Sequence, residues 1–334
     1  MGSKNKIVTA LGFSIIIFAI TGCDNEFEQL ELGISQSRSH NSSPNAARDD
    51  RPEGSKVKQA MRTTDIAKIE AHSMHLTKVS ALNAAPISPS IPTVNKKKPD
   101  FSRIRDVHAK KIAFFDYLYN YIEIVNLEVV QRKDRIIDIS HKKDSELADD
   151  DKAFIEQMSE MYLKDHDASD TIATANYLIP YVDIVPPSLA LAQAANESGW
   201  GTSRFAVNAN NYYGQWCFNK GCGLVPKKRN DGAAHEVRQF KTPQGSVRSY
   251  VRNINTHRAY KDIRKMRKEM RKNQQWPSGA DLAKGLSRYS QRKGAYVKEI
   301  QTLIRRNHLD KYDEKMRETI RQYRLKKGFN IVTL

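Results

Sequence analysis

Apolar residues recur every three or four positions from about Ser102 onwards, which is the spacing of one face of a helix. The clearest run comprises Val107, Ile112, Phe115, Leu118, Ile122, Val125 and Val129. It predicts a long amphipathic helix. A second helix is expected to begin within Asp149–Asp151, which are good capping residues, and to continue through Tyr162. Both helices belong to a predicted N-terminal extension, residues 102–168, which either packs on the later part of the chain or forms an independent partner-binding hairpin.

The rest of the chain predicts shorter helices and one β segment. Helices are expected over residues 172–181, 187–197, 246–257, 259–271, 281–289 and 295–307, and a β-hairpin lobe within residues 212–240. The predicted fold class is therefore mainly α, of the α+β kind, with a small β-hairpin lobe. This part of the chain is large enough to bury a single core.

The segment before the helices has no sustained periodicity. Residues 23–101 are rich in Ser, Asn, Ala and Pro, and this composition predicts a mostly disordered tether. A short helix is conceivable over residues 57–74. As a flexible coil, such a tether would reach on the order of 50 Å.

The first 22 residues resemble an export signal. Two lysines, Lys4 and Lys6, precede an apolar run over residues 7–20, and small residues then lead to Cys23. This pattern is typical of a bacterial lipoprotein signal peptide that is removed to leave a lipidated Cys23. The alternatives are an ordinary secretory signal or an uncleaved anchor, although about fourteen apolar residues are short for a membrane span. The expected location is the periplasm, with Asp24 favouring anchorage to the inner membrane.

The chain is strongly basic, with 55 Lys and Arg against 38 Asp and Glu and a formal net charge of +17. A basic balance usually suggests nucleic acid, but a periplasmic address argues against that partner. The local anions are phospholipid head groups and the carboxylates of the cell wall. Residues 311–334 form a basic C-terminal tail, expected to be solvated or, alternatively, to form a helix that touches membrane or wall.

Two further cysteines bracket a short glycine-containing turn. Cys217 and Cys222 predict a disulfide in an oxidising compartment. A zinc site would need more ligands, and only His235 follows within twenty residues. We therefore expect no metal.

The most informative motif is the apolar run Ala190–Gly201, which delivers one carboxylate to a Gly-Trp-Gly break. A helix that starts near Pro187 would end around Glu197, ahead of Gly199. Nearby apolar and aromatic side chains would disfavour the charged carboxylate and raise its pKa into the range of a general acid. The alternative is a solvated glutamate at a helix end.

Three more motifs come later in the chain, namely residues 208–217 (Asn-Ala-Asn-Asn-Tyr-Tyr-Gly-Gln-Trp-Cys), residues 235–240 (His-Glu-Val-Arg-Gln-Phe) and residues 288–296 (Arg-Tyr-Ser-Gln-Arg-Lys-Gly-Ala-Tyr). Together with the Asn-Glu-Ser-Gly-Trp-Gly core, this order resembles the glucosaminidase domains of glycoside hydrolase family 73. Within that superfamily it is most similar to the Bax-type periplasmic proteins of Gram-negative bacteria. The resemblance implies a lysozyme-like catalytic domain, assigned to residues 169–310, that needs no cofactor.

The resemblance also implies catalytic roles. Glu197 matches the family's catalytic glutamate, the general acid. Glu236 lies where family members carry a second acidic residue, with Asp231 as a rival; Glu236 could equally be a surface residue of a strand pair, and the substrate's N-acetyl group could take over its task. Tyr289 resembles the tyrosine that lies near the reacting sugar.

Substrate-binding residues are expected in the segment after the catalytic helix. Asn210, Asn211 and Tyr212 would line the sugar cleft, and Gln215 and Trp216 would continue its edge. Of the two adjacent tyrosines, Tyr213 is the one expected to be buried. Two other aromatic residues are given structural roles, Trp200 as a brace at the helix exit and Tyr296 as a core residue.

The predicted function is hydrolysis of peptidoglycan glycan strands by a β-N-acetylglucosaminidase, monomeric and held at a membrane by its lipid. A lytic transglycosylase is the nearest alternative enzyme, since it also uses a single glutamate in a Glu-Ser-Gly context. A non-catalytic wall-binding protein is the alternative of another class.

Overall fold

The predicted N-terminal helices form and pack against the rest of the protein. We describe a computed structural model over residues 94, 96–163, 166–227, 229, 234–288 and 294–328. Helix α2 (Val107–Ser140) begins where the Asp106 carboxylate accepts a hydrogen bond from the Ala109 backbone N–H at 2.6 Å. A short 3-10 turn, η1 (Asp144–Glu146), leads to α3 (Asp149–Tyr162). The long helix thus runs about three turns beyond its predicted pattern.

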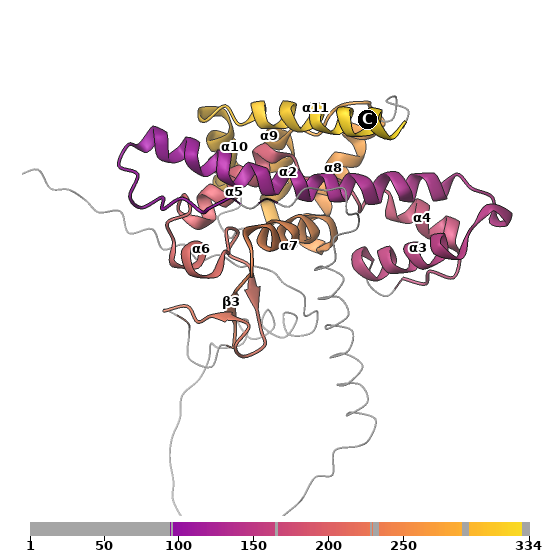
Figure 1. Cartoon of the computed structure of the whole chain (residues 1–334), viewed down its shortest axis with the longest axis horizontal. Coiled ribbons are helices and arrows are strands. Elements are labelled where there is room, and N and C mark those ends of the chain that lie inside the picture. Colours follow the sequence, from indigo (N-terminus) through magenta and orange to yellow (C-terminus); the bar gives the residue numbers. More distant parts are fainter. Residues whose placement is uncertain are drawn as a thin grey trace, which may run out of the picture. The chain divides into compact units, whose positions relative to one another are not determined.

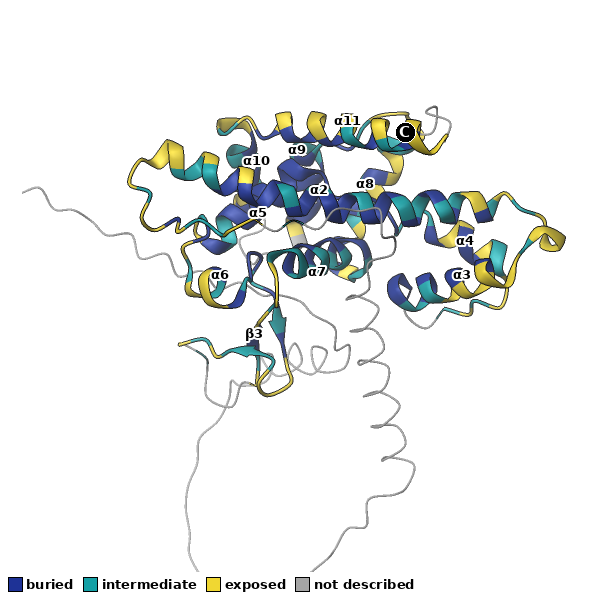
Figure 2. Ribbon diagram, in the orientation of Figure 1, coloured by how far each residue is buried: buried dark blue, intermediate teal, exposed yellow. Residues whose placement is uncertain are grey.

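Helix α2 is the central element of the core (Figure 1). It contacts α4 (Thr171–Leu178), α5 (Pro187–Ser198), α7 (Pro243–Thr256) and α11 (Asp310–Lys327). Its residues Leu118, Ile122 and Val125 are fully buried, as the dark ribbon of Figure 2 shows for much of its length. The extension therefore packs on the later helices of the chain instead of standing apart as a hairpin.

The predicted β lobe is a small sheet of three short strands. β1 (Trp216–Cys217) and β2 (Gly223–Leu224) both pair antiparallel with β3 (Glu236–Arg238), which gives the order β1-β3-β2. A Cβ atom at Gly223 would lie 2.0 Å from the Val237 carbonyl oxygen, so only glycine fits this pairing. The sheet follows α6 (Arg204–Ala209) and precedes α7.

Further short helices complete the body of the protein. They are η2 (Arg258–Tyr260), α8 (Lys261–Lys272), α9 (Gly279–Leu282), η3 (Ala283–Arg288) and α10 (Gly294–Arg306). Of these, α9 and α10 contact α5. The fold is mainly helical with a small antiparallel sheet, which confirms the predicted fold class.

The basic C-terminal segment corrects the expectation of a solvated tail. Helix α11 packs on α2 and α5, and its residues Met316 and Ile320 join a buried cluster with Val130 and Ile184. Its Arg324 also pairs with the buried Asp134 of α2 at 2.7 Å. The many basic residues of this segment made it resemble a solvated tail, although it forms a helix with one apolar face.

Several predictions concern residues outside the described part of the chain. They are the signal peptide, Cys23, the tether up to residue 93 with its conceivable short helix, Asp231 and Tyr289. Within the described residues, no helix combines the length and the apolarity that crossing a membrane requires.

Candidate active site

Helix α5 carries Glu197 in its last turn. Pro187 stands at the helix start, where its missing N–H costs nothing, and Gly199 ends the helix with a φ of 54°. The two following residues, Trp200 and Gly201, also have positive φ values of 59° and 76°. A Cβ atom at Gly201 would lie 2.6 Å from the Phe101 ring, so this sharp exit needs glycine. Trp200 packs edge-on against the Phe115 ring, as a brace for the helix exit.

The other end of α5 is fixed by a buried carboxylate from α11. Asp313 accepts hydrogen bonds from the backbone N–H and the hydroxyl of Ser188, the N–H bond being 2.7 Å long, and a longer one from the N–H of Gly279. Burial raises the pKa of this carboxyl to about 6 in spite of those donors. The C-terminal helix thus supplies the N-terminal anchor of the helix that bears Glu197.

The Glu197 carboxyl is half-buried and largely desolvated. Loss of water raises its pKa to about 7; hydrogen bonds from Tyr296 and Asn196 act against that rise, and the charge of Glu299 adds to it. The Tyr296 hydroxyl donates to Oε1 at 2.8 Å. The other oxygen, Oε2, is buried without a hydrogen-bond partner among the described residues. A carboxyl in this state is about half protonated at neutral pH. Its Oε2 keeps a hydrogen-bonding capacity that none of the described residues uses.

Behind this carboxyl lies a set of buried polar side chains from three helices. The amide of Gln193, on α5, donates to the Tyr296 hydroxyl at 3.1 Å and accepts from the Tyr250 hydroxyl at 2.7 Å. The Tyr250 ring in turn stacks on Tyr213, with 3.9 Å between ring centroids. Tyr296 is buried, as its spacing with other core residues predicts. Its contact with Glu197 is a functional feature that the sequence reasoning missed, because apolar periodicity reports where a ring lies and not where its hydroxyl points.

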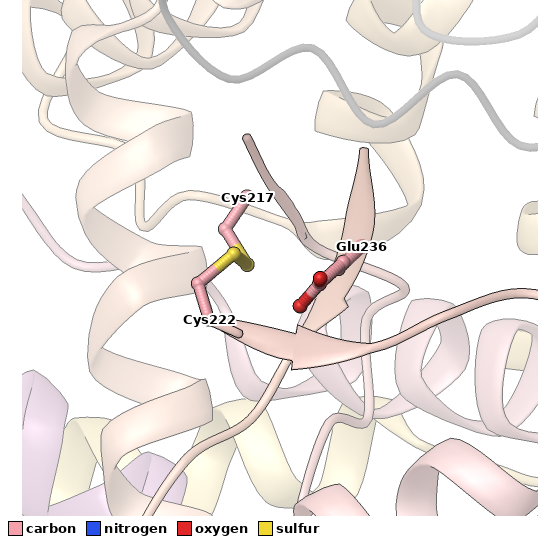
Figure 3. A group of neighbouring side chains, drawn as sticks. All are labelled: Cys217, Cys222 and Glu236. Carbon is pink, nitrogen blue, oxygen red and sulfur yellow. A yellow bond between two sulfur atoms is a disulfide. The ribbon is translucent and has the colours of Figure 1, made fainter. Parts of the chain in front are cut away.

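The second predicted catalytic carboxylate, Glu236, lies in the β lobe. Its two oxygens accept hydrogen bonds from the backbone N–H groups of Gly221 at 3.0 Å and Gly223 at 2.8 Å. These bonds hold the pKa of Glu236 below its usual range. Figure 3 shows the carboxylate pointing from β3 toward the disulfide that joins Cys217 and Cys222. Glu236 therefore organises the turn between β1 and β2.

The metal alternative also involves these groups. The sulfurs of the two cysteines and a Glu236 oxygen lie within 4.8 Å of one another. Because the two sulfurs are bonded to each other in the disulfide, they are not available as thiolate ligands. This cluster does not form a metal site in the oxidised protein.

Three of the predicted cleft residues are buried instead. Asn211 donates to the carbonyls of Gln215 and Arg238 and accepts from the Gln215 N–H, so it ties the lobe to the body. The Gln215 amide is bonded to the hydroxyl and the carbonyl of Ser246. Tyr212 is fully buried, and not only its neighbour Tyr213 as expected. In this structure these side chains support the site and present no surface to a sugar.

Two predicted cleft residues keep some accessible surface. Asn210 adopts the left-handed conformation at the end of α6, with φ of 49°, and its amide donates to the carbonyl of Phe240. Trp216 is half-buried and stacks on His235, with 4.1 Å between ring centroids. An indole and an amide at these positions are suited to a sugar ring, since aromatic faces pack on pyranose rings and amides bond hydroxyl groups.

Comparison with known proteins agrees with the motifs. The profile of the glucosaminidase family, described as "Mannosyl-glycoprotein endo-beta-N-acetylglucosaminidase", matches residues 182–325 and so includes most of α11. The chain is also similar to Protein bax of Escherichia coli (strain K12), with 30% identity over 198 residues that cover 59% of this chain and 70% of that relative. No solved structure matches it significantly.

Proposed function

This chain belongs to the glucosaminidase family of glycoside hydrolases, and from that premise we propose that it hydrolyses peptidoglycan. The bond cleaved would be the β-1,4 bond between N-acetylglucosamine and N-acetylmuramic acid, on the reducing side of the former. The observation that carries the proposal is the Glu197 carboxyl, with a pKa raised to about 7 and one oxygen without a protein partner among the described residues.

In the first step Glu197 acts as general acid. A sugar alkoxide is a poor leaving group, so the glycosidic oxygen must receive a proton as the bond to C1 breaks. The protonated Glu197 carboxyl would give that proton from Oε2. The carboxylate that remains then accepts a proton from the incoming water, which returns the enzyme to its starting state.

As the bond to C1 breaks, positive charge develops at C1 and needs a group that stabilises it. We propose that the acetamido oxygen of the substrate does this by bonding to C1, until water displaces it, and that Tyr289 hydrogen-bonds that acetamido group. Glu236 is the alternative, as base for a water. It would first have to release Gly221 and Gly223. Assistance by the acetamido group retains the configuration at C1, whereas a water activated by Glu236 inverts it.

The proposed setting is the periplasm, with the chain anchored to a membrane, the inner one favoured, through a lipid on Cys23. The basic n-region, the apolar run and the small residues before Cys23 support it, and so does a disulfide, which persists in oxidising compartments. Radiolabelled palmitate should enter the wild-type protein and not the Cys23→Ala variant.

Mass spectrometry of borohydride-reduced products tests the reaction. The full-length protein is incubated with purified peptidoglycan, and the released fragments are reduced and weighed. Reduced N-acetylglucosamine ends support the proposal. Ends carrying 1,6-anhydro-muramic acid, lighter by one water, would make the protein a lytic transglycosylase. No fragments, with wall binding retained in wild type and in Glu197→Gln, would point to a binding protein.

A further inference from the structure

The polar side chains behind Glu197 form one continuous chain of hydrogen bonds. The Tyr250 hydroxyl donates to Gln193 Oε1, Gln193 Nε2 donates to the Tyr296 hydroxyl, and the Tyr296 hydroxyl donates to Glu197 Oε1, at 2.7, 3.1 and 2.8 Å. Gln193, Tyr296 and Tyr250 are only 1%, 3% and 4% exposed. Few alternatives are open to these groups, because a buried polar atom that loses its partner is left unsatisfied.

This chain of hydrogen bonds runs from donor to acceptor in one direction, and Gln193 sets that direction. An amide offers a donor at one end and an acceptor at the other, whereas each tyrosine hydroxyl can act either way. With the Gln193 oxygen occupied by Tyr250, its N–H points to the Tyr296 oxygen, and the single hydrogen of Tyr296 is left to point to Glu197. A reversed amide would draw that hydrogen toward Gln193, and Glu197 Oε1 would lose the hydrogen bond from Tyr296.

Tyr250, at the end of the hydrogen-bond chain away from Glu197, is held in place by ring packing. Tyr250 stacks on Tyr213 with 3.9 Å between centroids and 7° between planes. The Tyr250 hydroxyl is therefore fixed relative to α5, and the amide orientation is fixed with it.

We propose that Gln193 is a positioning residue that, held by Tyr250, turns the Tyr296 hydroxyl toward Glu197 Oε1 and so keeps the acidic proton on Oε2. The proposal rests on the proposed function, in which Oε2 faces the glycosidic oxygen. It deepens that function by explaining how a carboxyl with two equivalent oxygens presents its proton on one of them. A proton on Oε1 would compete with the Tyr296 hydrogen for the same short contact.

Other groups also act on the Glu197 pKa, some in the same direction as the hydrogen-bond chain and some against it. On α5, Asn196 bonds to the carboxyl; on α10, Glu299 repels its charged form; and Tyr250 of α7 and Tyr260 of η2 lie within electrostatic range. Burial and Glu299 raise the Glu197 pKa, whereas the Tyr296 bond lowers it. Weakening the chain should therefore raise the Glu197 pKa further.

The test measures the Glu197 pKa directly, by NMR titration of its side-chain carboxyl carbon, in the full-length protein without substrate. The variants are Tyr296→Phe, Gln193→Met, Tyr250→Phe and the double variant of the first two. Tyr119→Phe is the matched control, because it also removes a buried tyrosine hydroxyl bonded to a carboxylate, that of Glu123, at 3.0 Å. The same variants are assayed for kcat and KM on peptidoglycan.

Tyr296→Phe should raise the Glu197 pKa by about one unit and Gln193→Met by about half a unit, in line with the loss of one hydrogen bond. Adding Gln193→Met to Tyr296→Phe should change nothing more, since Gln193 acts through Tyr296. For Gln193→Met, kcat should fall about three- to tenfold with KM unchanged. Tyr250→Phe should shift the pKa in the same direction by less, and Tyr119→Phe not at all.

A Glu197 pKa that stays at its wild-type value in Gln193→Met and Tyr250→Phe would overturn the proposal. The proposal would also fail if Gln193→Met shifted the Glu197 pKa by the same amount in the wild-type protein and in the Tyr296→Phe variant. If Gln193→Met does not fold, Tyr250→Phe decides alone, because phenylalanine keeps the stack on Tyr213. The pKa measurement needs no substrate and therefore separates the two proposals. If the pKa shifts are as predicted but the protein releases no fragments, the positioning role stands and only the proposed reaction is rejected.

Discussion

Glu197 and Glu236 are the same chemical group placed in opposite surroundings. Glu197 is desolvated at the end of α5, has one hydroxyl donor on Oε1 and none on Oε2 among the described residues, and its pKa rises to about 7. Glu236 has a backbone N–H on each oxygen, and its pKa falls below the usual range. The first carboxyl is prepared to give up a proton, and the second is held as an anion.

The difference shows which feature of a carboxylate indicates catalysis. Burial of the residue alone does not, because Glu236 is buried whereas Glu197 is only half-buried. What separates them is the loss of water around the Glu197 carboxyl and the use that the protein makes of the oxygens. N–H donors on both oxygens stabilise the charge of Glu236, whereas no described residue bonds to Oε2 of Glu197. Sequence motifs suggest a catalytic role for both residues, and their different surroundings distinguish them.

The largest effect on activity is expected when each carboxylate is exchanged for its amide. Glu197→Gln should lower kcat on peptidoglycan by about 10²- to 10⁴-fold, the usual contribution of a general acid, because an amide has no acidic proton. Glu236→Gln should keep kcat within about tenfold of wild type. Quantified release of reduced N-acetylglucosamine ends measures both. A loss for Glu236→Gln as large as that for Glu197→Gln would restore Glu236 as a catalytic base.

The pH dependence of stability should have opposite signs at the two residues. The folded-state pKa of Glu197 is raised from 4.5 to about 7, so the folded protein binds more protons than the unfolded one between those values, and stability falls as pH rises through that window. The shift corresponds to a free-energy change of roughly 3 to 4 kcal/mol. Glu236, with its lowered pKa, adds stability above the unfolded pKa and loses it as pH falls.

Urea unfolding at a series of pH values checks this prediction. Glu197→Gln should be more stable than wild type at pH 8 and nearly equal to it at pH 4, where the wild-type carboxyl is also neutral. An advantage of the variant that is as large at pH 4 as at pH 8 would contradict the raised pKa.

Asp313 combines features of both environments, namely deep burial and several hydrogen-bond donors. It accepts from Ser188 and Gly279 as Glu236 accepts from its glycines, yet its burial is deep enough to raise the pKa to about 6. Asp313→Ala should lower the free energy of unfolding by about 2 kcal/mol, because the start of α5 loses its hydrogen-bond acceptor. It should also lower kcat, since α5 carries Glu197. Asp310→Ala, an exposed residue three positions earlier on α11, is the control. Equal stability of the two variants would argue against α11 as an anchor of α5.

The smallest effect is expected within the β lobe. Glu236→Gln replaces one accepting oxygen by an NH₂ group, so one of the two glycine N–H groups loses its acceptor. The turn that holds Cys217 and Cys222 should loosen, and dithiothreitol should reduce the disulfide severalfold faster than in wild type. Thiol labelling over time measures this rate. A rate unchanged from wild type would mean that the carboxylate does not hold the turn.

Much of the fold could be predicted from sequence because its rules are local. The bounds of α5 follow from Pro187 and from Gly199, whose left-handed conformation ends the helix. The long α2 follows from apolar spacing. The exception is α11: its apolar residues Met316 and Ile320 are outnumbered by charges, and a buried Arg324 paired with Asp134 cannot be told from a solvated arginine without the fold.

The site was less predictable for a related reason. A motif marks which residues recur with a function, and not what each side chain does. Asn211, Tyr212 and Gln215 belong to such a motif, but they are buried and brace the backbone. In the other direction, the Tyr296 spacing indicates core, and its hydroxyl nevertheless reaches Glu197 across 99 residues of sequence. Contacts over that distance are set by the packing of α5 and α10.

The pH profile of kcat/KM on peptidoglycan tests most directly whether the protonated Glu197 carboxyl is the acid. Since that profile reports the groups of the free enzyme, its alkaline limb should turn near pH 7 and fall about tenfold for each further pH unit. The same limb should be absent from the residual activity of Glu197→Gln. A wild-type profile that stays level to pH 9, or a limb that survives in the variant, would contradict the account.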